Sequence, residues 1–439
     1  MTAKKRRWWA ITPLCFLMLS GCMSQGSPSA SNPNPPAAVS PVPNSTPKPT
    51  QTGTPSEAVP APAPAVNQPT QPADKVLEQI KKMSIHEKVG QLVVVGMDGL
   101  TNNDQTTQLI SEYHVGGFIF FKVNLKDTPQ ALALFNSLKS TNESVTGIPL
   151  MLSVDEEGGR VSRLPDELKK LPTNAAIGKI NNSEFSREIG ASLGKELKSF
   201  GLNMDFAPVL DVFSNPNNTV IGDRSFGNQA DVVSRLGVAT MQGIESAQVV
   251  AVVKHFPGHG DTAVDSHLGL PVVNHDLTHL RQLELVPFAS AINNGADAVM
   301  VAHLLMPKLD ADHPASFSKA VITDLLRKEM GFNGVVFTDD MTMGAITQNY
   351  EIGQAAVESV LAGGDIVLVG HSFDQQVQVI QALRSAVSNG TIPDSVLNAS
   401  VTRILKLKEK YHLSNSKSED PDIKGLNANL SALLGKYQK

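Results

Sequence analysis

The chain has 439 residues, of which 41% are hydrophobic and 18% are charged, so it is long enough to bury a sizeable core. Its formal net charge is −5, which argues against nucleic acid as a partner, because nucleic-acid binding calls for a basic patch. Cys15 and Cys22 are the only cysteines, which excludes a disulfide framework and a thiolate metal site in the rest of the chain.

The first 22 residues have the pattern of an export signal. Residues 4–7 are basic, and residues 8–19 form an apolar run that is too short for a stable membrane anchor. The run ends in Leu19-Ser20-Gly21-Cys22, which resembles the lipobox of bacterial lipoproteins. This resemblance implies removal of residues 1–21, lipidation of Cys22, and an extracytoplasmic protein attached to the membrane through its lipid alone. An ordinary signal peptide and a short uncleaved anchor are the alternatives.

Composition divides the rest of the chain into three segments. Residues 22–73 are rich in Pro, Ser and Thr with almost no large apolar side chains, so they cannot offset the entropy of ordering and predict a disordered tether. The composition becomes globular at Asp74, and no later break divides residues 74–413, which we assign to one folded domain. Residues 414–439 form a C-terminal tail whose weakly amphipathic end allows either a packed helix or a solvent-exposed extension.

Eight short apolar runs alternate with helix-like stretches in the folded domain. Their lack of polar alternation is typical of parallel strands covered on both faces. Eight such repeats favour a single (β/α)8 barrel of the TIM type over a doubly wound sheet, and no Gly-x-Gly-x-x-Gly motif follows the first run. The predicted strands are residues 92–96, 117–121, 150–154, 203–209, 249–253, 298–302, 334–337 and 366–369.

Two helix ends can be predicted from capping residues. Ser84, followed three residues later by Glu87, indicates a capping box that opens a helix before the first strand. The amphipathic stretch 183–200 is followed by Gly201, which is typical of a helix C-terminus.

Polar residues follow many of the predicted strands. Carboxyl ends of parallel strands meet at one rim of a barrel, where the active sites of such enzymes lie. The densest group is residues 254–267, which follow an apolar strand and contain three histidines and a lysine. The other candidates at strand ends are Asp155, Asp205, Asp211, His303, Asp339 and Asp340.

The segment 254–267, which closes with Asp265-Ser266-His267, resembles the signature of family 3 glycoside hydrolases of the β-N-acetylhexosaminidase branch. The similarity continues in order from about residue 74 to about residue 411, and as a set these blocks are specific. The other matching blocks are residues 83–92, 155–163, 222–227, 285–288 and 337–341.

The resemblance implies a retaining mechanism, in which a carboxylate forms a glycosyl-enzyme and a second group protonates the leaving oxygen. Asp339 matches the nucleophile of the family. His267 matches the acid/base, and Asp265 matches the carboxylate that orients it. Since Asp265 and His267 are two residues apart, an extended loop would project both side chains to one side, and an imidazole has a pKa near working pH.

The resemblance also implies a set of sugar-binding residues: Asp155, Arg163, Arg224, Lys254 and His255. We expect Asp340 to be structural and His259 to hold the loop through hydrogen bonds, while Asp211 and His303 have no assigned role. No cofactor and no metal are expected. The partner is an N-acetylglucosamine-containing glycan, and the extracytoplasmic location suggests fragments of peptidoglycan.

Several alternatives stay open. A metal-dependent barrel hydrolase could use His255, His259 and His267 as ligands, although no His-x-His motif follows the first strand. A family 3 β-glucosidase or xylosidase usually takes its acid from a glutamate on a further domain. The same site acting as a phosphorylase and a non-catalytic sugar-binding lipoprotein are the remaining possibilities.

Overall fold

The computed structural model describes residues 74–262, residue 266 and residues 269–437. The predicted signal segment, Cys22 and the tether therefore lie outside the described residues. Asp265 and His267, the predicted acid/base pair, also lie outside them.

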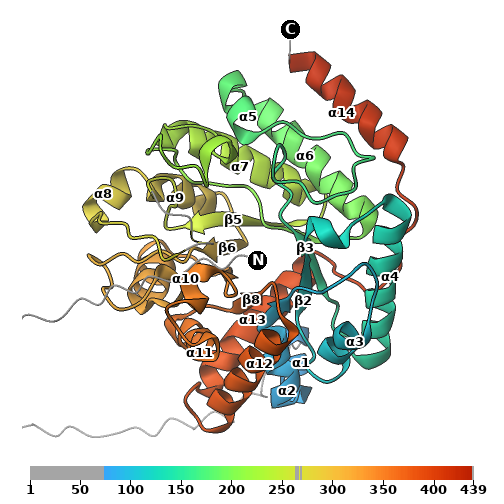
Figure 1. Cartoon of the computed structure of the whole chain (residues 1–439), viewed down its shortest axis with the longest axis vertical. Helices are drawn as coiled ribbons and strands as arrows, with labels where there is room; N and C mark the ends of the chain where they lie inside the picture. Colours follow the sequence, from blue (N-terminus) through green and yellow to red (C-terminus); the bar gives the residue numbers. More distant parts are fainter. Residues whose placement is uncertain (1–73, 263–265, 267–268, 438–439) are drawn as a thin grey trace, which may run out of the picture. The chain divides into compact units, whose positions relative to one another are not determined.

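The described domain is built on a closed barrel of eight parallel strands (Figure 1). Each strand pairs with its neighbours in sequence, and β1 pairs with β8 to close the barrel. The strands are β1 (Val93–Val95), β2 (Gly117–Phe120), β3 (Met151–Val154), β4 (Met204–Asp205), β5 (Val250–Phe256), β6 (Ala298–Val301), β7 (Val335–Asp340) and β8 (Ile366–Val369). The predicted fold class is confirmed.

Helices surround the barrel, as expected for strands that are apolar on both faces (Figure 1). The α-helices are α1 (Lys75–Lys82), α2 (Ile85–Gln91), α3 (Asp104–Ser111), α4 (Thr128–Val145), α5 (Asn174–Ile180), α6 (Ser183–Phe200), α7 (Ala230–Ser246), α8 (Leu277–Gln282), α9 (Leu285–Asn293), α10 (Gly344–Thr347), α11 (Ile352–Ala362), α12 (Phe373–Ser388), α13 (Asp394–Lys410) and α14 (Ile423–Tyr437). The shorter or π-helical segments are η1 (Lys122–Asn124), η2 (Gly222–Arg224), η3 (Ala315–Phe317) and η4 (Ala320–Glu329).

β8 has the predicted bounds, whereas each of the other strands differs by at least one residue at an end; β4, β5 and β7 differ most, by three or more residues at their carboxyl ends. The ladder of β4 ends at Asp205 although its apolar run continues, and Pro208, which follows closely, has no N–H to donate. β5 continues through Lys254 to Phe256, and β7 continues to Asp340. The chemically important side chains of these two strands are therefore held by barrel backbone rather than by loops.

The predicted helix ends are confirmed. Ser84 caps α2 in a capping box with Glu87, in which each side chain bonds to the backbone N–H of the other residue. α6 ends at Phe200, and Gly201 follows with a φ of 84°, a left-handed conformation that glycine adopts without strain.

The C-terminal tail contains the helix α14, which packs against α6. Leu430 is fully buried, and the rings of Tyr437 and Phe185 lie 4.7 Å apart. Of the two forms that the sequence allowed for this tail, the packed helix is the one observed.

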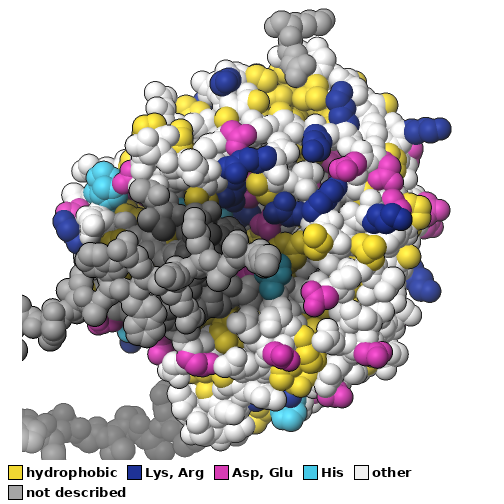
Figure 2. Space-filling view, viewed as in Figure 1, with side chains coloured by type: hydrophobic (Ala, Val, Ile, Leu, Met, Phe, Trp, Pro, Cys, Tyr) yellow, Lys and Arg dark blue, Asp and Glu magenta, His cyan; other side chains and the backbone are white. Residues whose placement is uncertain are grey.

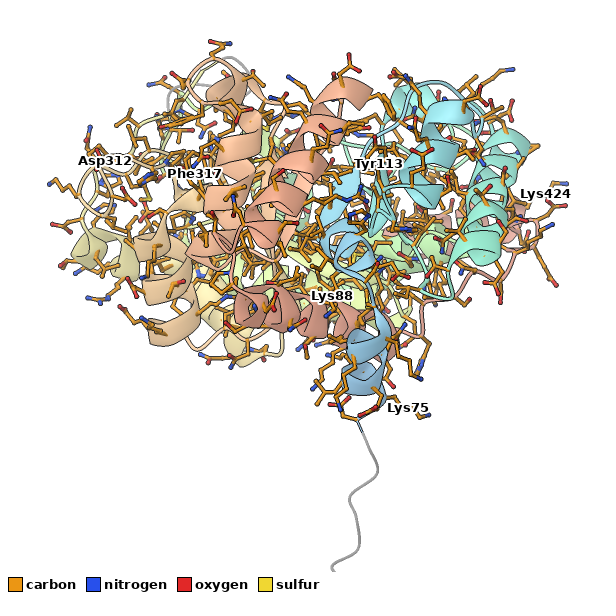
Figure 3. All side chains as sticks on the ribbon, turned by 90° about the horizontal axis from the view of Figure 1, so that it is seen from below. Lys75, Lys88, Tyr113, Asp312, Phe317 and Lys424 are labelled. Carbon is orange, nitrogen blue, oxygen red and sulfur yellow. The ribbon has the colours of Figure 1, made fainter. Side chains whose placement is uncertain are left out.

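The first helix of the described domain, α1, lies at the edge of the domain. Figure 3 shows α1 projecting beyond the other helices, with Lys75 at its outer end. Among the helices of the described ranges, we find none with the length and apolarity that crossing a bilayer requires.

Candidate active site

A cavity of about 430 Å³ opens at the carboxyl ends of the strands. Figure 2 shows basic side chains gathered above the middle of the view and a histidine near its centre. The predicted residues that line the cavity are Asp155, Arg163, Arg224, Lys254, His255 and Asp339. The fold thus brings together all the predicted barrel site residues except Asp265 and His267, which lie outside the described residues.

Lys254 is a buried cation at the end of β5. Its Nζ lies 2.5 Å from Oδ1 of Asp155 and 2.7 Å from Oε1 of Glu157, and its side chain is 2% exposed. Burial alone would lower the pKa of Lys254, but the two carboxylates outweigh burial and raise it. The two carboxylates therefore favour the charged form of Lys254 and compensate its charge.

Glu157 also forms an ion pair with Arg224, the second buried cation of the cavity. Its carboxylate accepts from Nε and Nη2 of Arg224 at 2.8 and 2.7 Å, a bidentate pair of the kind that fixes a guanidinium in both position and orientation. Although burial opposes ionisation, Arg224 and Lys254 hold the pKa of Glu157 far below its usual range.

Glu157 was not among the predicted site residues. Two features of the sequence could have indicated it: it lies in the acidic run after the third strand, and an extended chain would project it to the same side as Asp155.

His255 is oriented by Asp211, for which the sequence indicated no role. Nδ1 of His255 lies 2.6 Å from Oδ2 of Asp211, and Nε2 lies 3.3 Å from Nη2 of Arg224. Because a guanidinium can only donate, Nε2 is the acceptor, and Nδ1 carries the proton that Asp211 accepts. Asp211 is fully buried, and His255 lowers its pKa against the opposing effect of burial.

His259 holds the loop that follows β5, as the sequence predicted. Its backbone N–H donates to Asp211 at 2.6 Å, and its ring contacts Thr262 at 2.8 Å and Ser266 at 3.2 Å. Burial lowers the pKa of His259 to about 4, so its ring is neutral near pH 7. Gly260 permits this packing, because a Cβ there would lie 1.7 Å from the carbonyl oxygen of Val212.

Asp339 and Asp340 have different surroundings at the end of β7. Asp339 lines the cavity, and one of its oxygens accepts from the backbone N–H of Asp340 at 2.9 Å. Asp340 accepts from the backbone N–H groups of Thr342 and Gly370 at 2.9 and 2.8 Å. These bonds to backbone donors are those expected of a structural residue, and Asp340 also lines the cavity. His303 lies beneath, with Nε2 3.0 Å from the carbonyl oxygen of Asp340.

Arg163 retains hydrogen-bonding capacity at the cavity. Its backbone N–H donates to Glu156 at 2.6 Å, which fixes the loop after β3. Its Nε is buried and has no hydrogen-bond partner within the described part of the chain. A bound ligand with an acceptor oxygen would satisfy this donor.

One aromatic feature of the cavity was not anticipated from the sequence. The rings of Phe121 and His371 stack with centroids 4.5 Å apart, and both residues line the cavity. Phe121 follows β2 and His371 follows β8, so neither residue lies in the blocks that indicated a site.

Comparison with known proteins identifies the family. The model of the glycosyl hydrolase family 3 N-terminal domain matches residues 84–407. β-Hexosaminidase A of Pseudoalteromonas piscicida is 36% identical over 357 residues, covering 74% of this chain and 60% of the relative. β-Hexosaminidase LpqI of Mycobacterium tuberculosis is 36% identical over 336 residues, covering 74% of this chain and 83% of the relative. The chain thus spans less than two thirds of the first relative and most of the second.

Similarity to solved structures supports the same family. A family 3 β-N-acetylglucosaminidase from a Paenibacillus species superposes with a TM-score of 0.77 at 41% identity, covering 81% of this chain and 69% of the other. The structure of LpqI from M. tuberculosis superposes with a TM-score of 0.69 at 33% identity, covering 76% of this chain and 96% of that one.

Proposed function

The chain belongs to glycoside hydrolase family 3, and on that premise we propose that it is a retaining exo-β-N-acetylglucosaminidase. The substrate is a glycan with N-acetylglucosamine at its non-reducing end. The observation that carries the proposal is the single cavity that Asp339 shares with the compensated cations Lys254 and Arg224 at the carboxyl ends of the strands.

Asp339 is the proposed nucleophile. Its carboxylate forms a bond to the anomeric carbon while the glycosidic bond breaks, and the leaving oxygen takes up a proton. Its place on β7 supports this role, because the barrel fixes the backbone from which the short side chain extends. Water then attacks the glycosyl-enzyme and releases the sugar with retained configuration.

His267 is the proposed acid/base, and Asp265 is the residue proposed to orient it. Both lie outside the described residues, so the support comes from Ser266 between them in sequence. Ser266 is buried, lines the cavity, contacts the ring of His259 and accepts from the backbone N–H of Ala345 at 3.0 Å.

The two buried cations of the cavity are paired with carboxylates, which favours a neutral sugar beside them. Lys254 is paired with Asp155 and Glu157, and Arg224 is paired with Glu157, so these cations carry little uncompensated charge. Paired groups of this kind suit hydrogen bonds to hydroxyl and acetamido groups better than capture of an anion. Arg163, whose Nε has no hydrogen-bond partner among the described residues, also lines the cavity, so hydrolysis and phosphorolysis are distinguished by product analysis.

The natural substrate proposed is a fragment of peptidoglycan, and the proposed location is extracytoplasmic, with the protein attached to a bacterial membrane. Both proposals depend on the lipobox-like sequence that ends at Cys22. Labelling with a radioactive fatty acid tests the anchor. The Cys22→Ser variant should lose the label, whereas the neighbouring Ser20→Ala variant should be labelled because it keeps Cys22.

The decisive experiment measures turnover of an aryl β-N-acetylglucosaminide and of the β-linked N-acetylglucosamine disaccharide. Asp339→Asn should abolish both, whereas Asp104→Asn, on the exposed start of α3, should change neither. His267→Ala should slow the disaccharide by about 10²- to 10⁴-fold, the usual contribution of a general acid, and the activated aryl substrate far less. His86→Ala, at an exposed histidine of α2, is the matched control.

A fluorinated N-acetylglucosaminyl substrate should trap a covalent adduct on Asp339, detectable by peptide mass spectrometry. An adduct on another residue, or full activity of Asp339→Asn, would contradict the proposal. Product analysis with and without phosphate separates the hydrolase from the phosphorylase, and catalysis that survives exhaustive chelation would exclude a metal-dependent hydrolase.

A further inference from the structure

A group of histidine and carboxylate side chains lies outside the catalytic cavity, where the loop after β5 meets α8 and α9. His275 precedes α8, His279 belongs to α8, Glu284 immediately precedes α9, and Asp261 lies in the loop. None of these four residues lines the cavity described above. Figure 2 shows histidine and carboxylate side chains next to one another on the surface where Figure 1 places α8.

The potential ligand atoms of His275, His279 and Glu284 all lie within 4.8 Å of one another. Nε2 of His279 is 3.4 Å from Oε1 of Glu284. Two ligands of a tetrahedral zinc ion, each about 2.05 Å from the metal, are about 3.3 Å apart, so this pair already has the spacing of a zinc site. The rings of His275 and His279 stack with centroids 3.8 Å apart and an interplanar angle of 11°, so the rings would have to tilt apart for both to coordinate one ion through their in-plane lone pairs.

Glu284 supplies a second and independent indication of a ligand. Its side chain is 1% exposed, yet neither carboxylate oxygen has a hydrogen-bond partner among the described residues. A buried carboxylate without hydrogen bonds is costly. A bound cation would compensate this carboxylate.

We propose that His275, His279 and Glu284 form a binding site for a divalent transition-metal ion, with Zn²⁺ as the cation that fits best. Two imidazoles and one carboxylate are donors that zinc accepts readily, and a tetrahedral ion keeps a fourth position for water. Asp261 borders the site, since its Oδ2 lies 2.6 Å from Nε2 of His275. A carboxylate in this position fixes the tautomer and orientation of a histidine ligand.

An ion can reach the site from solvent. The side chains of His275 and His279 are 28% and 44% exposed, whereas Glu284 closes the inner side. Gly258 packs against the stem of the Glu284 side chain, since a Cβ on this glycine would be 2.6 Å from Cβ and 2.9 Å from Cγ of Glu284.

The site would connect the loop after β5 to the α8–α9 region. Gly258 packs against Glu284, and Asp261 pairs with His275. Both loop residues flank His259, whose backbone and ring are bonded to residues of the active-site region. The metal therefore has a structural role for this loop and takes no part in the bond-making steps.

Zn²⁺ titration of the metal-free full chain by calorimetry tests the proposal, with Co²⁺ as a spectroscopic probe of the coordination. One ion should bind per chain, and His279→Ala and His275→Ala should each weaken binding by more than about 100-fold, because loss of an outer partner alone costs about 10- to 100-fold. Glu284→Gln keeps the shape of the side chain and should weaken binding similarly. Asp261→Asn should weaken Zn²⁺ binding by about 10- to 100-fold, the usual effect of losing a hydrogen-bond partner of a metal ligand.

His86→Ala should bind Zn²⁺ as the parent does, because this exposed histidine belongs to α2. Asp339→Asn should also bind it normally, because Asp339 lines the separate cavity. Melting curves without metal establish that the variants are folded, and the exposed positions of the two histidines favour this outcome. Unchanged Zn²⁺ affinity in His275→Ala and His279→Ala, or loss of binding in Asp339→Asn, would overturn the proposal.

Discussion

Replacing Glu157 by glutamine removes the charge that links the two buried cations of the cavity while keeping the volume of the side chain. Glu157 contacts Lys254 at 2.7 Å and Arg224 at 2.7 and 2.8 Å. Its own side chain is 1% exposed, and those of Lys254 and Arg224 are 2% and 13% exposed. Solvent therefore screens these interactions little.

The expected loss of stability follows from that burial. Removing one partner of a buried ion pair costs about 3–5 kcal/mol, because the remaining charge is left uncompensated. Asp155 still neutralises Lys254 in the variant, and the introduced amide oxygen can accept one hydrogen bond, so the lower end of this range applies. For a domain of this size, with an unfolding entropy of about 0.75 kcal/mol/K, a loss of about 3 kcal/mol corresponds to a fall in melting temperature of roughly 4 °C.

Differential scanning calorimetry at pH 7 measures this fall. Glu78→Gln is the matched control, because Glu78 makes the same type of contact to Lys81 at 2.7 Å but is 48% exposed. An exposed pair contributes about 0–1 kcal/mol, so this control should shift the melting temperature by no more than about 2 °C. Equal shifts in the two variants would refute the reasoning that burial gives the Glu157 contacts their strength.

The pH dependence provides an independent check. The pKa of Glu157 is lowered in the folded protein, so its contribution is fully present above the unfolded pKa of about 4.5 and is lost as the pH falls below that value. The difference between the parent and Glu157→Gln should therefore be constant from pH 6 to pH 8 and should shrink below about pH 4.5. A difference that persists unchanged in acid would indicate steric disruption by the substitution.

Two further substitutions test other parts of the domain. Burial raises the pKa of Glu196 to about 8, so the stability of the parent should fall as the pH rises from about 4.5 to about 8. Glu196→Gln should therefore melt at a higher temperature than the parent at pH 8 but not at pH 4.5. Parallel plots of melting temperature against pH for the two proteins would contradict this. Leu430→Ala should lower the free energy of unfolding by about 2–4 kcal/mol, because Leu430 on α14 is fully buried against the domain. Leu77→Ala, at a side chain that is 47% exposed, should leave the free energy of unfolding nearly unchanged. Equal shifts of melting temperature in the two variants would show that α14 contributes little stability.

Much of the fold could be predicted because it depends on local patterns. Apolar runs without alternation predicted the strands, and Ser84 and Gly201 predicted two helix ends from capping chemistry alone. Parallel strands also bring their carboxyl ends to one rim, so the positions of Asp155, Lys254 and Asp339 along the chain were enough to expect them around one cavity.

Pairings across the barrel could not be predicted in the same way. Asp155 and Lys254 are 99 residues apart, and Glu157 and Arg224 are 67 apart, so spacing along the chain says nothing of the 2.5–2.8 Å contacts between them. Arg224 was expected as a sugar-binding cation, and only the structure shows that its charge is already matched by Glu157.

The sequence by itself determined the barrel, its rim and the kinds of side chain that the rim carries, because strand periodicity and strand order are encoded locally. The tertiary structure decided which charges compensate one another, why Asp211 orients His255, and how Glu284 comes to lie buried beside two histidines. The physical reason is that ionisation, tautomer and metal affinity depend on distances of a few ångströms and on exclusion of water. Both quantities arise only when remote segments pack together.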